Sequence, residues 1–338
     1  MKREPFLISG TEIRAGSRKT LHIPVSRRYS SADLSLPIHV VHGTRPGPTL
    51  FVSAALHGDE INGVEIVRRL LRRSNLKSIR GTLIAVPIVN VYGFLAQTRY
   101  LPDRRDLNRC FPGSPQGSLA GRLAHTFMTE VVSKATHGID LHTGSLHRTN
   151  LPQIRTTLDV AGCQELAESF GAPIILDAAI REGSLRESAG KLGVPIIVYE
   201  AGEALRFDEV AIRAGVRGLL SAMRYLEMFP PTNKNRRAVK PVVAKGSTWV
   251  RAHESGILGT TLRLGAGVVA GQKMGAISDP LGEAEIPILA PCDGVLIGRT
   301  NLPLINEGDA LFHLGTFTRL DPIAEKVERF HEEIDPDY

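Results

Sequence analysis

Two residues with metal-binding side chains, His57 and Glu60, stand three positions apart where an apolar run meets an amphipathic one. The apolar run, residues 48–56, is typical of a buried strand, and the amphipathic run, residues 61–73, is typical of a helix. A spacing of three on a first helical turn points both side chains the same way. An imidazole and a carboxylate supply two of the three protein ligands of a catalytic zinc site, which keeps its fourth position open for water. Such a pair also occurs by chance, so a metal site is indicated only if the sequence offers a third ligand.

The segment 136–144 predicts a strand whose alternation places Asp140 and His142 on one face. His142, at the strand's end, is the predicted third zinc ligand, because ligands bind outside the carboxyl ends of strands in α/β sheets. Asp140 is expected to orient a ligand imidazole. The competing histidines, which lie in a helical pattern, before the strand and in a loop, are His125, His137 and His147.

One zinc ion per chain at such a site would lower the pKa of a bound water towards ~7, which makes hydroxide available at neutral pH. Hydrolysis then needs a carboxylate that moves protons. Glu200 ends the predicted strand 194–200 and is the expected general base, then acid to the leaving amine. Glu203 is its rival, and capping of the next helix is the alternative role for either residue.

An arginine-rich irregular loop, residues 97–113, lies between the two ligand segments, and irregular loops often carry sites. Arg99 could stabilise the oxyanion that forms when water adds to the scissile carbonyl. Arg109 beside Asn108 could hold a substrate carboxylate through a guanidinium fork and an amide donor. A solvated, charged surface loop is the alternative.

Strands and helices alternate along residues 48–230, which predicts an α/β domain with a mixed sheet flanked by helices. The expected strands are 49–56, 82–89, 137–142, 173–178 and 194–200, and the expected helices are 61–73, 118–135, 159–170, 184–192 and 205–229.

The flanking regions differ from this domain in composition. Residues 1–47 predict strands that pack on the sheet edge, and residues 231–241 predict a polar linker. Residues 242–320 are glycine-rich and predict a smaller all-β domain, which resembles a barrel-sandwich hybrid. Residues 321–338 predict an acidic tail with a short helix and a frayed end.

The composition excludes several classes of protein. The 338 residues carry a net charge of only +6 with 5% aromatics, and the basic residues are scattered, so nucleic-acid binding is not indicated. Three distant cysteines are typical of a reduced, cytoplasmic protein. Neither a signal peptide nor a run of ~18 apolar residues is evident, so no membrane contact is expected. The sequence allows a homo-oligomer.

Five spaced motifs together resemble the succinylglutamate desuccinylase/aspartoacylase family, whose fold is zinc carboxypeptidase-like. They are His57–Glu60, Thr98–Tyr100, Asp106–Arg109, Asp140–Gly144 and Glu200–Gly202. The resemblance implies a Zn²⁺-dependent deacylase that cleaves the amide bond of a small N-acyl amino acid through a metal-bound hydroxide. It implies His57, Glu60 and His142 as metal ligands and Glu200 and Arg99 as catalytic residues. The substrate-binding residues that it implies are Asn108, Arg109 and Arg186.

Two alternatives to this function remain at the level of the sequence. One is a zinc carboxypeptidase that acts on a short peptide, and the other is a non-catalytic metal-binding or carrier-like module. A carrier needs a lysine at a hairpin tip, whereas Lys273 lies in a strand-like segment. The sequence leaves open the acyl group, the amino acid, the native metal, the oligomeric state and the role of the C-terminal β domain.

Overall fold

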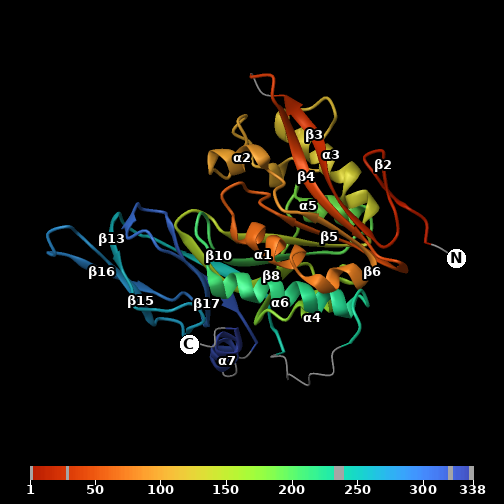
Figure 1. Cartoon of the computed structure of the whole chain (residues 1–338). Helices are drawn as coiled ribbons and strands as arrows, with labels where there is room; N and C mark the ends of the chain where they lie inside the picture. Colours follow the sequence, from red (N-terminus) through yellow and green to blue (C-terminus); the bar gives the residue numbers. More distant parts are fainter. Residues whose placement is uncertain (1–2, 28–29, 232–239, 319–322, 335–338) are drawn as a thin grey trace.

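A computed structural model describes residues 3–27, 30–231, 240–318 and 323–334. Within these ranges, thirteen strands form one mixed sheet that runs through the protein (Figure 1). Four neighbouring parallel strands make up its centre. In their order across the sheet they are β6 (Arg80–Val86), β5 (Arg45–Ala54), β7 (His137–Gly144) and β10 (Ile196–Glu203).

Helices cover both faces of this sheet, which explains why central strands such as β6 are largely apolar, although β7 also carries Asp140 and His142. On β5, Leu50 and Val52 face one apolar core, whereas Phe51 faces the core on the opposite side of the sheet. The helices that pack on the same side as Leu50 and Val52 include α1 (Asn62–Leu71), α4 (Cys163–Phe170) and α6 (Glu209–Tyr225). The opposite face carries α3 (Leu119–Glu130) and α5 (Leu185–Lys191).

The N-terminal residues extend one end of the sheet. The strands β3 (Ser17–Arg27) and β4 (Asp33–His42) pair antiparallel, and β4 pairs in turn with β6. A separate two-stranded ribbon precedes them, β1 (Phe6–Ile8) and β2 (Thr11–Ile13).

At its other end the sheet continues into the C-terminal residues. Next to β10 lies β8 (Arg148–Thr156), which pairs with β17 (Gly294–Thr300), and β17 pairs with β19 (Ala310–Thr316). The outermost strand is β12 (Gly246–Arg251). Shorter strands attached beside this path are β9 (Ile174–Asp177), β11 (Val242–Ala244) and β14 (Gly267–Val268).

A four-stranded sheet with its own apolar core completes the C-terminal region. Its strands are β13 (Gly256–Gly259), β15 (Lys273–Ser278), β16 (Glu285–Leu289) and β18 (Leu304–Ile305). The chain then forms α7 (Ile323–Ile334), whose Phe330 is buried in the core beside α6. The predicted helix of the tail is thus present, while its expected frayed end and most of the expected linker, residues 232–239, lie outside the described residues. No helix in the described part of the chain is long and apolar enough to cross a membrane.

The sequence analysis missed β8 and the short helix α2 (Val91–Ala96). The β8 segment contains Pro152 and polar residues such as Gln153, so it lacks the alternation that marks a half-buried strand. Two predicted helices also begin later than expected. A left-handed Gly162 (φ 82°) precedes α4, and the side chain of Asp208 accepts a hydrogen bond from the amide of Ala211 at the start of α6.

The expected helix 118–135 is interrupted. Ser118 caps α3, which ends at Glu130, and the turn Val132–Lys134 follows as a short 3₁₀ helix. Two more 3₁₀ turns occur at Ser74–Ser78 and Leu107–Arg109.

The close packing of α1 on the central strands gives a first prediction. A Cβ atom added to Gly63 would lie 2.7 Å from the Cβ of Ala54 and 2.8 Å from the Cβ of Leu141. We expect Gly63→Ala to lower the free energy of unfolding by about 1–3 kcal/mol through overpacking, measured by urea denaturation. Gly190→Ala is the matched control, because that helical site has open space and should gain about 0.5–1 kcal/mol from helix propensity. Equal effects of the two variants would contradict the packing argument.

Candidate active site

The corner between β5 and α1 is built from a strained backbone and a close contact. Ala55 adopts a left-handed conformation (φ 47°) directly after β5. A Cβ on Gly58 would lie 1.9 Å from the carbonyl carbon of Gly93, so only glycine allows α2 to pack against this corner. His57 and Glu60 lie in a turn that precedes α1, in which the amide of Glu60 donates to the carbonyl of His57. The expected placement on a first helical turn is therefore wrong, although the turn also brings both side chains together.

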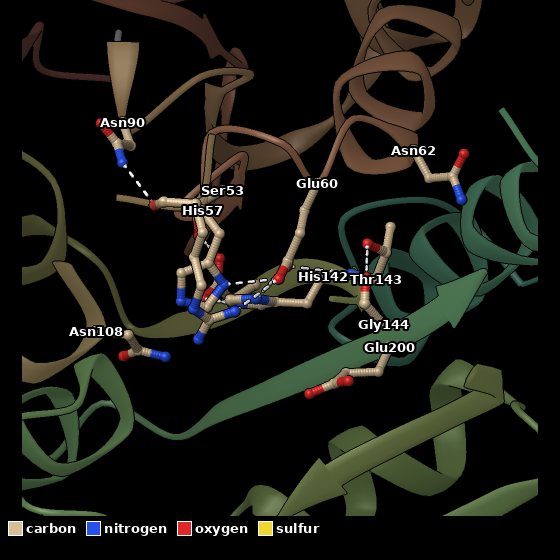
Figure 2. A network of polar contacts seen from close by, with 12 residues as sticks. Ser53, His57, Glu60, Asn62, Asn90, Asn108, His142, Thr143, Gly144 and Glu200 are labelled. Carbon is tan, nitrogen blue, oxygen red and sulfur yellow. Dashed lines mark hydrogen bonds and ion pairs between the residues drawn. The ribbon is translucent and has the colours of Figure 1, made fainter. Parts of the chain in front are cut away.

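Figure 2 shows the side chains of His57, Glu60 and His142 pointing toward one another. The Nδ1 atom of His57 lies 2.8 Å from Oε1 of Glu60, and Nδ1 of His142 lies 2.7 Å from Oε2 of the same carboxylate. All three residues are buried, and one ligand atom of each lies within 4.8 Å of the others. This buried group could bind a metal ion.

The competing histidines are not part of this group. Among the described residues it consists of His57, Glu60 and His142, without His125, His137 or His147. The geometry therefore brings together the three residues that the sequence analysis selected, and their role as ligands remains a prediction.

In each of the two imidazoles, the Nε2 atom, which points away from Glu60, contacts another carboxylate. The Nε2 atom of His142 lies 2.6 Å from Oδ2 of Asp140, whose other oxygen accepts a hydrogen bond from Ser53. The Nε2 atom of His57 lies 3.1 Å from Oδ1 of Asp106. Each ring thus turns Nδ1 toward Glu60 while a carboxylate fixes its orientation, an arrangement that suits metal ligation. Asp140 was expected in this position, whereas the role of Asp106 was missed although its motif had been noticed.

The same carboxylates set the protonation of the metal-free cluster. Burial alone would lower the pKa of His57 and of His142, but the neighbouring carboxylates outweigh burial and raise both pKa values. Burial would raise the pKa of Glu60, yet the two imidazoles hold it well below its usual range. The cluster without metal is therefore a buried, internally neutralised ion group, and a metal dication would take over the role of the imidazole protons.

Arg99 reaches the same cluster from the loop after α2. Its Nη1 lies 3.2 Å from Oε1 of Glu60, and its Nη2 donates to Oδ2 of Asp106 at 2.9 Å. The backbone carbonyl of Arg99 also accepts a hydrogen bond from Asn90, which fixes this part of the loop. The guanidinium is thus placed next to the candidate metal ligands, and its catalytic role remains a prediction.

Glu200 lies on the strand next to His142. In the parallel pairing of β10 with β7, these two residues are direct partners, and Figure 2 shows Glu200 below His142. Asn150 on β8 donates to Oε2 of Glu200 at 2.6 Å, and Nε of Arg155 lies 3.5 Å from Oε1. The rival Glu203 does not line the cavity beside the cluster and accepts a hydrogen bond from Asn301 instead.

The expected substrate-binding residues also meet at this cavity. The side chain of Asn108 accepts a hydrogen bond from the amide of Leu185 at 2.9 Å, which joins its loop to the start of α5. Arg109 donates to the carbonyl of Asn108, and Arg186 donates to the carbonyls of Ala178 and Ala179. Burial, and then the positive charge of Arg155, lowers the pKa of Arg186.

A cavity of about 940 Å³ connects all of these groups. The eight predicted site residues line it, as do Asn150 and Arg155, which the sequence analysis did not identify. Its outer wall comes from the C-terminal strands through Trp249 of β12 and His313 of β19. The sequence contained one indication that β8 belongs to the site. Two arginines, Arg148 and Arg155, occur in this polar segment, and both line the cavity.

Comparison with known proteins decides the family. Residues 46–226, more than half of the chain, match the model of the succinylglutamate desuccinylase/aspartoacylase catalytic domain. The chain belongs to this family. Its members are deacylases of N-acyl amino acids, so the protein is an amide hydrolase that acts on carbon–nitrogen bonds, and the predicted α/β fold with its C-terminal antiparallel strands is confirmed.

Individual relatives agree with this assignment. A deacetylase of N-α-acetyl-L-2,4-diaminobutyric acid from Halomonas elongata is 29% identical over 86% of this chain and 89% of its own length. A succinylglutamate desuccinylase/aspartoacylase structure from Rhodobacter sphaeroides is 25% identical, with a TM-score of 0.78, over 88% of this chain and 95% of that one. The product-bound ectoine utilization protein EutE (DoeB) from Ruegeria pomeroyi shares the fold, with a TM-score of 0.82 at 22% identity over 93% and 99% of the two chains.

The cluster leads to a prediction about metal content. We expect purified wild-type protein to retain about one divalent ion per chain after dialysis, and His142→Ala to retain almost none, because a site that loses one of three protein ligands loses most of its affinity. Metal analysis by mass spectrometry measures this. His137→Ala is the control, since His137 begins the same strand but lies outside the cluster. Full occupancy in the His142 variant would remove that residue from the ligand set.

Proposed function

We propose that the protein is a zinc-dependent deacylase that hydrolyses the amide bond of a small N-acyl amino acid. The observation that carries this proposal is the convergence of His57, Glu60 and His142 at a cavity that also contains Glu200. Two imidazoles and one carboxylate match the ligand set of catalytic zinc sites. The carboxylates behind both imidazoles support the fit, because such partners orient zinc-bound histidines.

Zinc, when bound, would activate a water molecule and polarise the substrate carbonyl. The residues of this chain would supply the remaining steps. Glu200 accepts the proton of the attacking water and delivers it to the leaving amine. Arg99 donates a hydrogen bond to the carbonyl oxygen as negative charge develops there. Asn150, hydrogen-bonded to Glu200, keeps that carboxylate directed toward the reacting group.

The shape of the cavity favours a small substrate over a peptide. Trp249 and His313 line the same cavity as Asn108 and Arg109, and its volume of about 940 Å³ is within the range of small-molecule sites. We therefore assign Asn108 and Arg109, with Arg186, to the carboxylate end of an acyl amino acid. The curated relative, named for an acetylated amino acid, supports this substrate class over the carboxypeptidase alternative.

The carrier-like alternative has no support in the C-terminal region. Lys273 starts strand β15 and pairs with Leu289 of β16, and its ammonium group is 2.7 Å from Glu285. A carrier lysine has to be free at a hairpin tip so that it can be modified and can move.

The proposed role of Glu200 gives a direct kinetic prediction. We expect Glu200→Gln to retain bound zinc while kcat falls by about 10²–10⁴, because the amide cannot accept the proton of the attacking water. Hydrolysis of N-acetyl amino acids by the zinc-loaded protein, followed through amine release, measures the effect.

Glu203→Gln is the matched control, because it removes a charge from the same strand without affecting the cavity. Its turnover should stay within a few-fold of wild type. If the Glu203 variant were inactive and the Glu200 variant active, the proton-transfer role would belong to Glu203.

A further inference from the structure

Asn150 contacts Glu200 from a strand that joins the central sheet to the C-terminal strands. It lies on β8, which pairs with β10 on one side and with β17 on the other (Figure 1). Its side chain is 6% exposed, and its Nδ2 atom donates to Oε2 of Glu200 at 2.6 Å. The direct partner of Glu200 on β8 is Gln153, whose amide donates instead to the carbonyls of Leu151 and Ile297. Of these two amides, Asn150 is therefore the one that positions Glu200.

The contact with Glu200 fixes the orientation of the Asn150 amide. A general base has to be ionised before the reaction, and an ionised carboxylate only accepts hydrogen bonds. The amide therefore has to direct its nitrogen, and not its oxygen, toward Glu200. The Oδ1 atom is then directed toward β17, where Gly298 is the partner of Asn150 in the antiparallel register.

Gly298 leaves open the space next to this oxygen. A Cβ atom added to Gly298 would lie 2.7 Å from Oδ1 of Asn150, which is closer than side chains pack. The Cβ of His313 and the carbonyl oxygen of Thr149 would lie at 3.4 and 3.5 Å, which are ordinary contacts. Gly298 is not among the residues with positive φ, so its backbone conformation does not require glycine. The Asn150 side chain is thus what a larger residue at this position would displace.

Such a displacement would move the amide rather than the sheet. Oδ1 is at the end of a side chain, which can rotate, whereas backbone atoms of paired strands cannot shift without loss of hydrogen bonds. Rotation that takes Oδ1 away from β17 also turns Nδ2 away from Glu200, because both atoms belong to one planar group. Gly298 itself does not line the cavity, so its effect on Glu200 has to pass through Asn150.

We propose that Gly298 is a positioning residue of the deacylase: the absence of a side chain on β17 lets Asn150 hold Glu200 in the orientation that proton transfer needs. This inference rests on the proposed function, and in particular on Glu200 as the proton carrier. Misplacement of a reacting group by about 1 Å costs on the order of 10²-fold in rate. Through this contact, β17 acts on proton transfer without contributing a side chain to the cavity.

Gly298→Ala tests the inference in the zinc-loaded full-length protein. We expect kcat for an N-acetyl amino acid to fall by about tenfold to a hundredfold, because Glu200 loses its fixed orientation. KM should stay within a few-fold of wild type, since the substitution leaves the proposed substrate-binding residues in place. Zinc content, measured by mass spectrometry, should equal that of wild type.

Gly294→Ala is the matched control on the same strand. Gly294 is also buried, and a Cβ there would lie 2.8 Å from the carbonyl oxygen of Gly315 on β19. Because this oxygen belongs to the paired backbone, Gly294→Ala should lower the midpoint of thermal unfolding at least as much as Gly298→Ala. Its kcat should nevertheless stay within a few-fold of wild type, since the crowding does not involve Asn150. A merely structural effect would make activity follow stability in both variants.

A double-mutant cycle shows whether the effect passes through Asn150. Asn150→Ala removes both the donor to Glu200 and the oxygen that crowds position 298, so it should lower kcat by about tenfold to a hundredfold on its own. The addition of Gly298→Ala to this variant should change kcat by no more than about twofold, because the two substitutions interrupt the same contact.

The outcomes separate this inference from the proposed function. Wild-type kcat in Gly298→Ala, an equal loss in Gly294→Ala, or a further tenfold loss on top of Asn150→Ala would overturn the positioning role and leave the deacylase intact. If the wild type hydrolysed no acyl amino acid, or if Glu200→Gln stayed active, the proposed function would fail. Crystal structures of the two glycine variants would then still decide the positioning. A bond between Asn150 and Glu200 that is lost only in Gly298→Ala supports it, and an intact bond in that variant overturns it.

Discussion

The parallel pairing of β7 with β5 on one side and β10 on the other is the constraint on which the candidate site depends. Parallel strands end at the same edge of a sheet, so the corner after β5, His142 on β7 and Glu200 on β10 necessarily lie together. The direct partnership of Glu200 with His142 fixes the spacing between the proposed proton carrier and the candidate metal ligands. A shift of register by one residue would turn Glu200 to the opposite face of the sheet.

Buried charge is arranged in two different ways at this edge. Around His57 and His142 every imidazole nitrogen faces a carboxylate, and the ion group compensates itself without a ligand. Near Arg186 the positive charges of Arg155 and Arg181 lie together, and Glu200 is a carboxylate that contacts Arg155. The first arrangement fixes the side chains at the centre of the candidate site.

The local sequence indicated which side chains meet at the centre of the candidate site, but it did not indicate the residues of the outer wall. His57 and Glu60 follow the apolar strand β5, and His142 and Glu200 lie near the ends of β7 and β10, positions that the hydrophobic pattern helps to locate. The wall depends on pairings between residues far apart in the chain, such as Asn150 with Gly298 and Trp249 with His313. The local hydrophobic pattern contains no information on which strands pair. The polar segment of β8 also lacks the alternation of apolar and polar residues that predicts a strand. The domain boundaries expected at residues 47, 230 and 241 remain proposals.

The hydrogen bonds between β17 and β8 have a consequence for how this architecture can change. The strand that supplies Asn150 to Glu200 is also the strand on which the C-terminal region is built, so the wall cannot swing aside without exposing unpaired backbone groups. The cavity is also lined by Tyr100, Arg109 and Arg181, which lie outside the sheet. Removal of the whole C-terminal region, by contrast, would leave residues 148–150 of β8 without their partner strand, while residues 153–156 would stay paired with β9.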